Sequence, residues 1–286
     1  MVQCDCYTKL AGVSRETIMS ARIIAFANQK GGVGKTTTAV SLAGELAYRG
    51  LRVLLIDLDP QGNATTSLGI DKQRLRTTTY EVLIGNAPTE LAILETGREQ
   101  LYLLPATMSL AGAAVELVDV PRREQRLGDA LLPVHEAFDW ILIDCPPSLG
   151  LLTLNGLCAS RGVVIPLQCE YLALEGLAQL KNTIDLVRSS LNPHLHITGV
   201  VMTMYDGRTN LAQQVVEEVR RYFPQRIFNT LIPRTIRMSE APSYGKLISE
   251  YDPQSRGAQA YRMLCEELLR REGEPVTVAT KRSGAL

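Results

Sequence analysis

The chain has 286 residues, 45% of them hydrophobic, and its 30 acidic and 30 basic side chains leave a formal net charge of zero at neutral pH. This balance excludes a protein that holds nucleic acid through its overall charge, because such a role would need a local basic patch. No apolar run reaches the length of a membrane span, the N-terminus lacks the apolar region of a signal peptide, and the six cysteines follow no regular framework. We therefore expect a globular cytoplasmic protein with reduced thiols and no membrane partner.

Residues 1–20 lack the hydrophobic periodicity of the rest of the chain. We expect a flexible N-terminal extension there, then one folded domain over 21–272 and a polar tail over 273–286. Met19 lies directly before the first predicted strand and is an alternative translation start. The lone C-x-C pair at 4–6 has no second pair nearby, which is more typical of an incidental tail than of a metal site.

The first motif is residues 28–38, which read NQKGGVGKTTT. The apolar residues 23–27 before it predict a strand, and the pattern after it predicts a helix. A glycine loop in this position can close its backbone N–H groups around phosphate oxygens, and the helix N-terminus adds a favourable dipole. Lys35 can then reach the β and γ phosphates, and Thr36 can place its hydroxyl on Mg²⁺. The candidate phosphate-binding residues are Gly31, Gly32, Val33, Gly34, Lys35, Thr36 and Thr37.

The loop departs from the usual phosphate-binding pattern G-x-x-x-x-G-K-[ST] at one position. That pattern requires glycine at position 29, where this chain has Gln29, and Lys30 stands directly before the glycines. A plain glycine turn and a solvated surface lysine are the simpler interpretations of these residues.

The second motif follows the apolar run 53–56, which is typical of a buried parallel strand. It begins with Asp57 and Asp59, two carboxylates at the carboxyl end of a central strand, where open α/β sheets bind ligands. One of them alone could instead cap a loop. Beyond this motif the periodicity predicts helices over 78–85 and 108–132 and a strand over 101–104.

The third motif ends the apolar run 140–143. Asp144 follows that run, and an acid that ends a hydrophobic strand downstream of a phosphate loop is placed to hold Mg²⁺. Pro146 and Pro147 can continue neither a strand ladder nor a helix, so we expect them to shape a loop.

The rest of the chain alternates strand and helix patterns. This alternation predicts a mostly parallel, twisted sheet with helices on both faces, in one α/β domain. In the predicted helix over about 171–191, apolar residues recur at heptad-like spacing, which favours packing in the core over a dimer seam. The predicted strands are 162–167, 197–203 and 227–232, and the predicted helices are about 171–191, 209–223 and 255–271.

These motifs resemble those of the ParA/Soj-type partitioning ATPases, which belong to the ParA/MinD branch of P-loop ATPases with a deviant Walker A loop. The resemblance covers about 22–271, and the later segments that carry it are 203–211, 232–234, 239–243 and 251–253. It implies a Mg²⁺-dependent ATPase, in which Asp144 is the Walker B acid.

The same resemblance assigns roles that spacing alone could not. It implies that Asp59 positions the attacking water, that Asp57 lies in the outer shell of the metal, and that Pro233 helps to shape the pocket for the base. It also implies that Lys30 crosses the interface of an ATP-sandwiched homodimer to contact the nucleotide of the partner.

Partitioning ATPases of this type bind double-stranded DNA without sequence preference in the ATP dimer, and a ParB-like partner stimulates hydrolysis and release. We therefore expect a nucleoid-associated protein. Residues 186–237 contain seven arginines and no lysine against three acids, a local balance of +4. Arg208 matches a DNA-binding arginine of the family, while Arg220, Arg221 and Arg237 are weaker candidates, for which a solvated helix face is the alternative.

The same residues bear on other possible functions. A MinD-like positioning ATPase acting on a membrane or a protein cluster is the main alternative, but the sequence from 273 to 277 breaks the periodicity of the amphipathic helix it needs. A nitrogenase-reductase-like carrier needs cluster cysteines, and the segment 105–112 has none. A small-molecule ligase needs a substrate pocket that sequence does not reveal. The presence of Lys35, Thr36 and Asp59 disfavours a binder that does not hydrolyse ATP.

Overall fold

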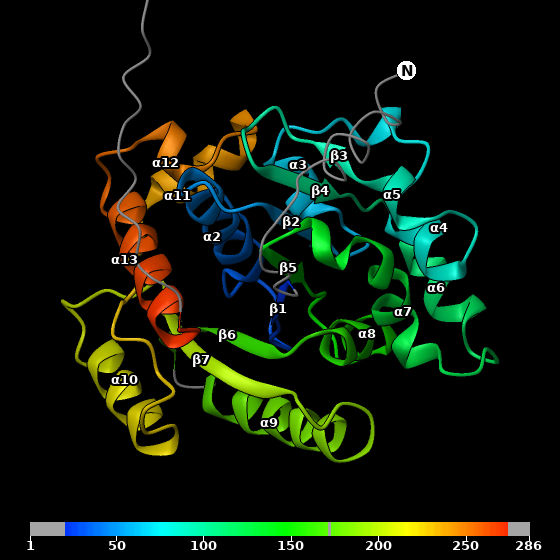
Figure 1. The fold of residues 1–286 in the computed structure, drawn as a ribbon. Helices are drawn as coiled ribbons and strands as arrows, with labels where there is room; N and C mark the ends of the chain where they lie inside the picture. The colour runs from blue at the N-terminus through cyan, green and yellow to red at the C-terminus, as the bar shows by residue number, and fades with distance from the viewer. Residues whose placement is uncertain (1–20, 171–172, 274–286) are drawn as a thin grey trace, which may run out of the picture.

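The computed structural model describes residues 21–170 and 173–273. Within them the strands form one seven-stranded sheet in the order β3-β4-β2-β5-β1-β6-β7, and every pairing is parallel except that of β3 with β4 (Figure 1). The expected α/β class with a mostly parallel sheet is therefore confirmed. The strands are β1 (Arg22–Phe26), β2 (Val53–Asp57), β3 (Leu94–Glu95), β4 (Leu101–Leu104), β5 (Trp140–Asp144), β6 (Gly162–Gln168) and β7 (His196–Thr203).

Helices cover both faces of the sheet (Figure 1). One apolar core joins the sheet to α2, α12 and α13, and the other joins it to α4 and to α6 through α10. Sheets buried on both faces need strands that are apolar throughout, and β2 and β5 are fully buried. The longer helices are α2 (Lys35–Tyr48), α6 (Leu110–Glu116), α8 (Leu151–Ala159), α9 (Ala173–Ser190), α10 (Asn210–Tyr222) and α13 (Arg256–Arg271). The shorter ones are α3 (Asn63–Ser67), α4 (Thr79–Ile84), α5 (Thr89–Ala92), α7 (Arg126–Leu131), α11 (Ile236–Glu240) and α12 (Ile248–Tyr251), with 3₁₀ turns η1 (Lys72–Arg74), η2 (Arg123–Gln125), η3 (Leu132–Ala137) and η4 (Ala241–Tyr244).

Most predicted elements are present. The apolar stripe of α9 is core, as expected, since Leu177, Leu180 and Ile184 are all buried. The extension, the cysteines at 4–6 and nearly all of the tail lie outside the described residues. The short helix α3 and the nine-residue helix α8 were missed, because neither shows a clear apolar period.

Two predicted elements are wrong. The helix over 108–132 breaks after α6, where Pro121 cannot donate to a helix and Arg122 takes a positive φ of 57°. In place of the predicted strand over 227–232 there are two isolated bridges. One joins Ile227 to Val200 of β7, and the other joins Pro233 to Tyr205, just after β7. The Glu267 carboxylate accepts the amides of residues 229 and 230, so those amides do not join a strand ladder.

The fold brings three strand ends together. Asp144 is paired with Phe26 of β1 on one side and with Asp57 of β2 on the other. Because the strands are parallel, the glycine loop after β1 and both acidic motifs meet at the same edge of the sheet.

Candidate functional site

The glycine loop has a fixed shape. Gly32 and Gly34 have positive φ angles of 73° and 85°, which residues with a Cβ rarely adopt. The Thr203 hydroxyl at the end of β7 donates to the Val33 carbonyl at 2.8 Å, and the Asn28 amide donates to a carbonyl of β6 at 2.7 Å. The loop is therefore held by the two strands beyond β1.

Lys35 begins α2 at the base of this loop and is buried. Its ammonium donates to the Lys30 carbonyl at 3.2 Å, which is the one hydrogen bond of that ammonium among the described residues. Burial lowers the pKa of Lys35, and the carboxylates of Asp144 and Asp59 oppose this effect. A buried cation with one neutral partner favours an anionic ligand.

Asp144 is fully buried, and neither of its carboxylate oxygens meets a hydrogen-bond partner in the described part of the chain. Burial raises its pKa well above the usual value, and the neighbouring Asp57 adds to this, although the charge of Lys35 and the Thr36 hydroxyl, which is close by but makes no well-formed hydrogen bond, act in the opposite direction. A buried carboxylate without partners is costly. A divalent cation beside Thr36 would remove that cost, so these residues fit Mg²⁺.

Asp57 is satisfied in a different way. One of its oxygens accepts the amide and the hydroxyl of Thr65 at 2.8 and 2.7 Å, and the other accepts the amide of Asp59 at 3.2 Å. Burial raises its pKa to about 6 even though these bonds lower it. Asp57 therefore orders the loop that carries Asp59.

An open cavity of about 480 Å³ lies over the glycine loop. Of the predicted residues, Gly31, Gly32, Gly34, Lys35, Thr36, Thr37 and Asp59 line it. Val33 is buried, Asp57 and Asp144 lie behind the lining, and Lys30 and Pro233 are not part of it. Lining residues that were not named as site residues are Gln61, Asn63, Thr66, Ser67, Pro147, Met204, Pro242 and Ser243. Six of these eight belong to segments that the sequence analysis singled out: the motif over 57–65, the proline loop, 203–211 and 239–243.

Lys30 points to a partner that sequence reasoning missed. Its ammonium lies 2.6 Å from the Glu170 carboxylate, and the two side chains are 42% and 47% exposed. Gln168 donates to the other oxygen of Glu170. The distinctive lysine is thus held outside the cavity, by a residue 140 positions away.

The candidate arginines differ in their surroundings. Arg208 is highly exposed and pairs with Asp206 at 2.6 Å. Arg237 pairs with Glu240 at 3.1 Å. Arg220 and Arg221 are exposed at the end of α10 and have no ion pair within the described ranges.

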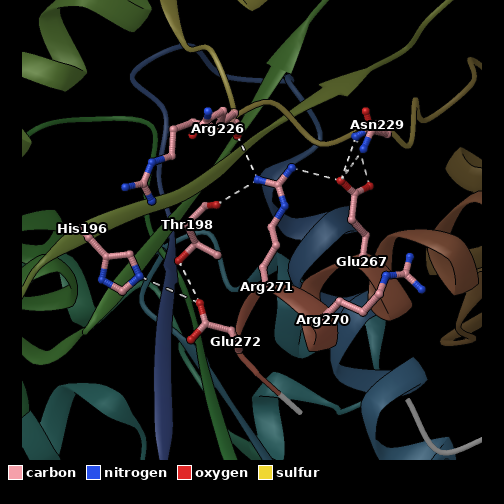
Figure 2. A pocket seen from close by; sticks show the side chains of 9 residues that line it. His196, Thr198, Arg226, Asn229, Glu267, Arg270, Arg271 and Glu272 are labelled. Atoms are coloured by element: carbon pink, nitrogen blue, oxygen red, sulfur yellow. Dashed lines mark hydrogen bonds and ion pairs between the residues drawn. The ribbon is translucent and has the colours of Figure 1, made fainter. Parts of the chain in front are cut away.

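A second hollow of about 430 Å³ lies where the start of β7 meets the end of α13 (Figure 2). Arg271 donates to the carbonyls of Thr198 and Arg226, both at 3.1 Å, and pairs with Glu267 at 2.9 Å. Glu267 in turn accepts the amide of Asn229. Because these groups satisfy one another, we assign the network to holding α13 against the edge strand.

Two features are absent from the described residues. None of their helices is long and apolar enough to cross a bilayer. They also contain no group of three or more His, Cys, Asp or Glu side chains arranged to hold a metal by themselves. The lone carboxylate of Asp144 is instead typical of a metal bound together with a phosphate ligand.

A glycine loop between β1 and α2, a buried lysine and a buried strand-end acid define a P-loop nucleoside triphosphatase. A family model described as an AAA domain matches residues 21–197. The chain is 56% identical over 247 residues to the sporulation initiation inhibitor protein Soj of Bacillus subtilis, covering 86% of this chain and 98% of that protein. It is 53% identical over 251 residues to the chromosome partitioning protein ParA of Myxococcus xanthus, covering 88% and 89%.

Among solved structures, one described as cobyrinic acid a,c-diamide synthase from Mycobacterium smegmatis, with bound ADP and magnesium, superposes with a TM-score of 0.79. It is 42% identical and covers 88% of this chain and 96% of that one. The chain belongs to the Soj/ParA family of chromosome-partitioning ATPases.

Proposed function

We propose that this ATPase binds Mg²⁺–ATP in the cavity over the glycine loop and uses its hydrolysis to control a DNA-bound dimer. ATP and Mg²⁺ are its cofactors. The observation that carries the proposal is Asp144, whose unpartnered buried carboxylate lies behind a phosphate-binding loop. The loop amides and Lys35 hold the phosphates, while Thr36 and Asp144 hold the metal, which neutralises charge on the phosphates when bound.

Hydrolysis also needs a positioned water molecule. We assign this task to Asp59, which lines the cavity and whose carboxylate accepts the amide of Gln61 at 2.9 Å. Asp57 acts behind it, because its oxygens already accept three hydrogen bonds from this loop. Asp59→Ala should therefore retain ATP binding and lose hydrolysis, which nucleotide titration and phosphate release would measure separately. Loss of binding instead would place Asp59 in nucleotide capture.

The dimer is proposed from the position of Lys30. Its side chain lies outside the cavity of its own chain and is partly exposed, so it can exchange its ion pair with Glu170 for a contact to the nucleotide of a second copy. Lys30→Ala should abolish ATP-dependent dimerisation in light scattering, whereas Lys181→Ala, which removes an exposed lysine paired at the same 2.6 Å distance, should not. An unchanged dimer in Lys30→Ala would refute this role.

The dimer is proposed to bind double-stranded DNA through its arginine-rich segment. Arg208 is exposed, and its ion pair with Asp206 lies at the surface. Contacts to DNA phosphates could replace that ion pair. Arg208→Ala should weaken binding to random DNA at moderate salt and lower the salt slope, whereas Arg74→Ala, which removes a similarly exposed and paired arginine outside that segment, should not. Wild-type DNA affinity in an Arg208→Ala protein that still dimerises would refute this role.

We further propose that a ParB-like partner stimulates hydrolysis and that the ATP-bound protein is associated with the nucleoid. The MinD-like alternative predicts that the ATP-bound protein binds a membrane surface instead of DNA. With ATP present, co-sedimentation with liposomes and no gel shift on random DNA would favour that alternative. A gel shift that depends on ATP, without liposome binding, supports the partitioning function.

A further inference from the structure

Two walls of the cavity do not belong to the phosphate-binding loop. Asn63, Thr66 and Ser67 of α3 form one, and Pro242 and Ser243 of η4 form the other. Since the loop amides and Lys35 account for the phosphates, these walls are left for the ribose and the base.

The two walls meet directly behind their lining residues. A Cβ placed on Gly245 would lie 2.7 Å from the Cα of Gly69, closer than real Cβ contacts allow. Both glycines have positive φ angles, 62° at Gly245 and 81° at Gly69. The backbones that follow α3 and η4 are therefore pressed against each other, and their spacing sets the distance between the walls.

A single arginine fixes this seam. Arg98, in the turn between β3 and β4, donates to the Leu68 carbonyl at 3.1 Å and to the Gly245 carbonyl at 2.7 Å. The same guanidinium is bidentate to Glu250, with bonds of 2.7 and 2.8 Å. Its side chain is only 18% exposed. The planar group thus joins one carbonyl from each wall and a carboxylate, which a lysine could not do.

Glu250 connects Arg98 to the start of α12. Its carboxylate also accepts the amide of Leu247 at 2.9 Å, at the start of α12. Burial acts to raise the pKa of Glu250, but the bonds from Arg98 and Leu247 outweigh it, so the pKa lies below its usual value. The partner of Arg98 is therefore ionised at neutral pH.

We propose that Arg98 is a positioning residue for the nucleoside half of ATP: it clamps the wall formed by α3 to the wall formed by η4. The proposal rests on the assignment of this cavity to ATP. It predicts that Arg98 affects the ribose and base and leaves the contacts to phosphate unchanged.

Two probes, both with Mg²⁺, separate the nucleoside contacts from the phosphate contacts. ATP makes both kinds of contact, and inorganic tripolyphosphate makes only those to phosphate. In Arg98→Gln the Kd for ATP should rise about tenfold, with the Kd for tripolyphosphate and kcat within about twofold, because only the spacing of the walls changes. Arg98→Lys should not restore ATP affinity. Glu250→Gln keeps the shape and removes the charge, so it should show a smaller change of the same kind. Arg74→Gln, which removes an exposed arginine paired with Asp71, is the matched control and should change neither Kd.

Equal losses of affinity for both probes, or unchanged ATP affinity in both Arg98 variants, would overturn the proposal. If Arg98→Gln does not fold, unchanged ATP binding by Glu250→Gln would do so. The assignment of the cavity is tested separately by Lys35→Ala, which should lose both probes. ATP binding that survives Lys35→Ala would refute that assignment and leave no basis for the clamp.

Discussion

The ion pair between Lys30 and Glu170 should restrain dimerisation, because Lys30 must leave Glu170 before it can reach a partner. The pair is short, at 2.6 Å, but both side chains are more than 40% exposed. Exposed pairs contribute about 0–1 kcal/mol. A dimer breaks two of them, so Glu170→Gln should favour dimerisation by at most about 2 kcal/mol, or about 30-fold in the dimer dissociation constant.

Analytical ultracentrifugation with a non-hydrolysable ATP analogue would measure this shift. The difference between Glu170→Gln and the wild type should shrink at high salt, since screening already weakens the pair. Asp185→Asn is a matched control, because it breaks the 2.6 Å pair with Lys181, whose exposure is similar. A weaker dimer in Glu170→Gln would refute the reasoning, since it would show that Glu170 supports the dimer.

Three further predictions concern the buried site. Lys35→Ala should weaken ATP binding by at least about 100-fold, measured by nucleotide titration, because a buried cation contacting phosphate is lost. Asp144→Asn should abolish the dependence of ATP affinity on Mg²⁺, measured by nucleotide titration with and without the metal, since the carboxylate proposed to hold the metal is lost. Asp57 has a pKa of about 6 in the folded chain against an ordinary 3.8. The folded state therefore binds the extra proton between these values, and the free energy of unfolding should fall by about 2 kcal/mol as pH rises from 4 to 7. Urea unfolding of nucleotide-free Asp57→Asn should lack that component, and an identical pH slope in the variant would contradict it.

The sequence was most informative where apolar runs end in acids. The runs before Asp57 and Asp144 predicted buried parallel strands, and parallel pairing alone then brings their carboxyl ends to one edge. Local patterns also predicted the glycine loop and the helix after it. None of these inferences required knowledge of long-range side-chain contacts.

Contacts between distant segments were beyond such patterns. Glu170 lies 140 positions from Lys30, and Glu250 lies 152 positions from Arg98, so neither pair leaves a local signal. The prediction of a strand over 227–232 was wrong for the same reason, a contact with a distant residue. Its apolar pattern is suitable for a strand, but Glu267 on α13 takes two of its amides.

The loop that carries Asp59 is continuous with the wall that Arg98 clamps. Asp57 binds that loop at Thr65, inside α3, and the carbonyl of Leu68, the residue that ends α3, accepts a hydrogen bond from Arg98. On the other side of the seam, η4 directly follows α11, the helix that bears Arg237. If Asp59 positions water at the γ-phosphate as proposed, α3 is the segment through which its displacement would reach the seam, and this seam borders the helix with a candidate DNA contact. The proposed coupling between hydrolysis and DNA release would need a contiguous connection between the two sites, and α3, the seam and η4 form one.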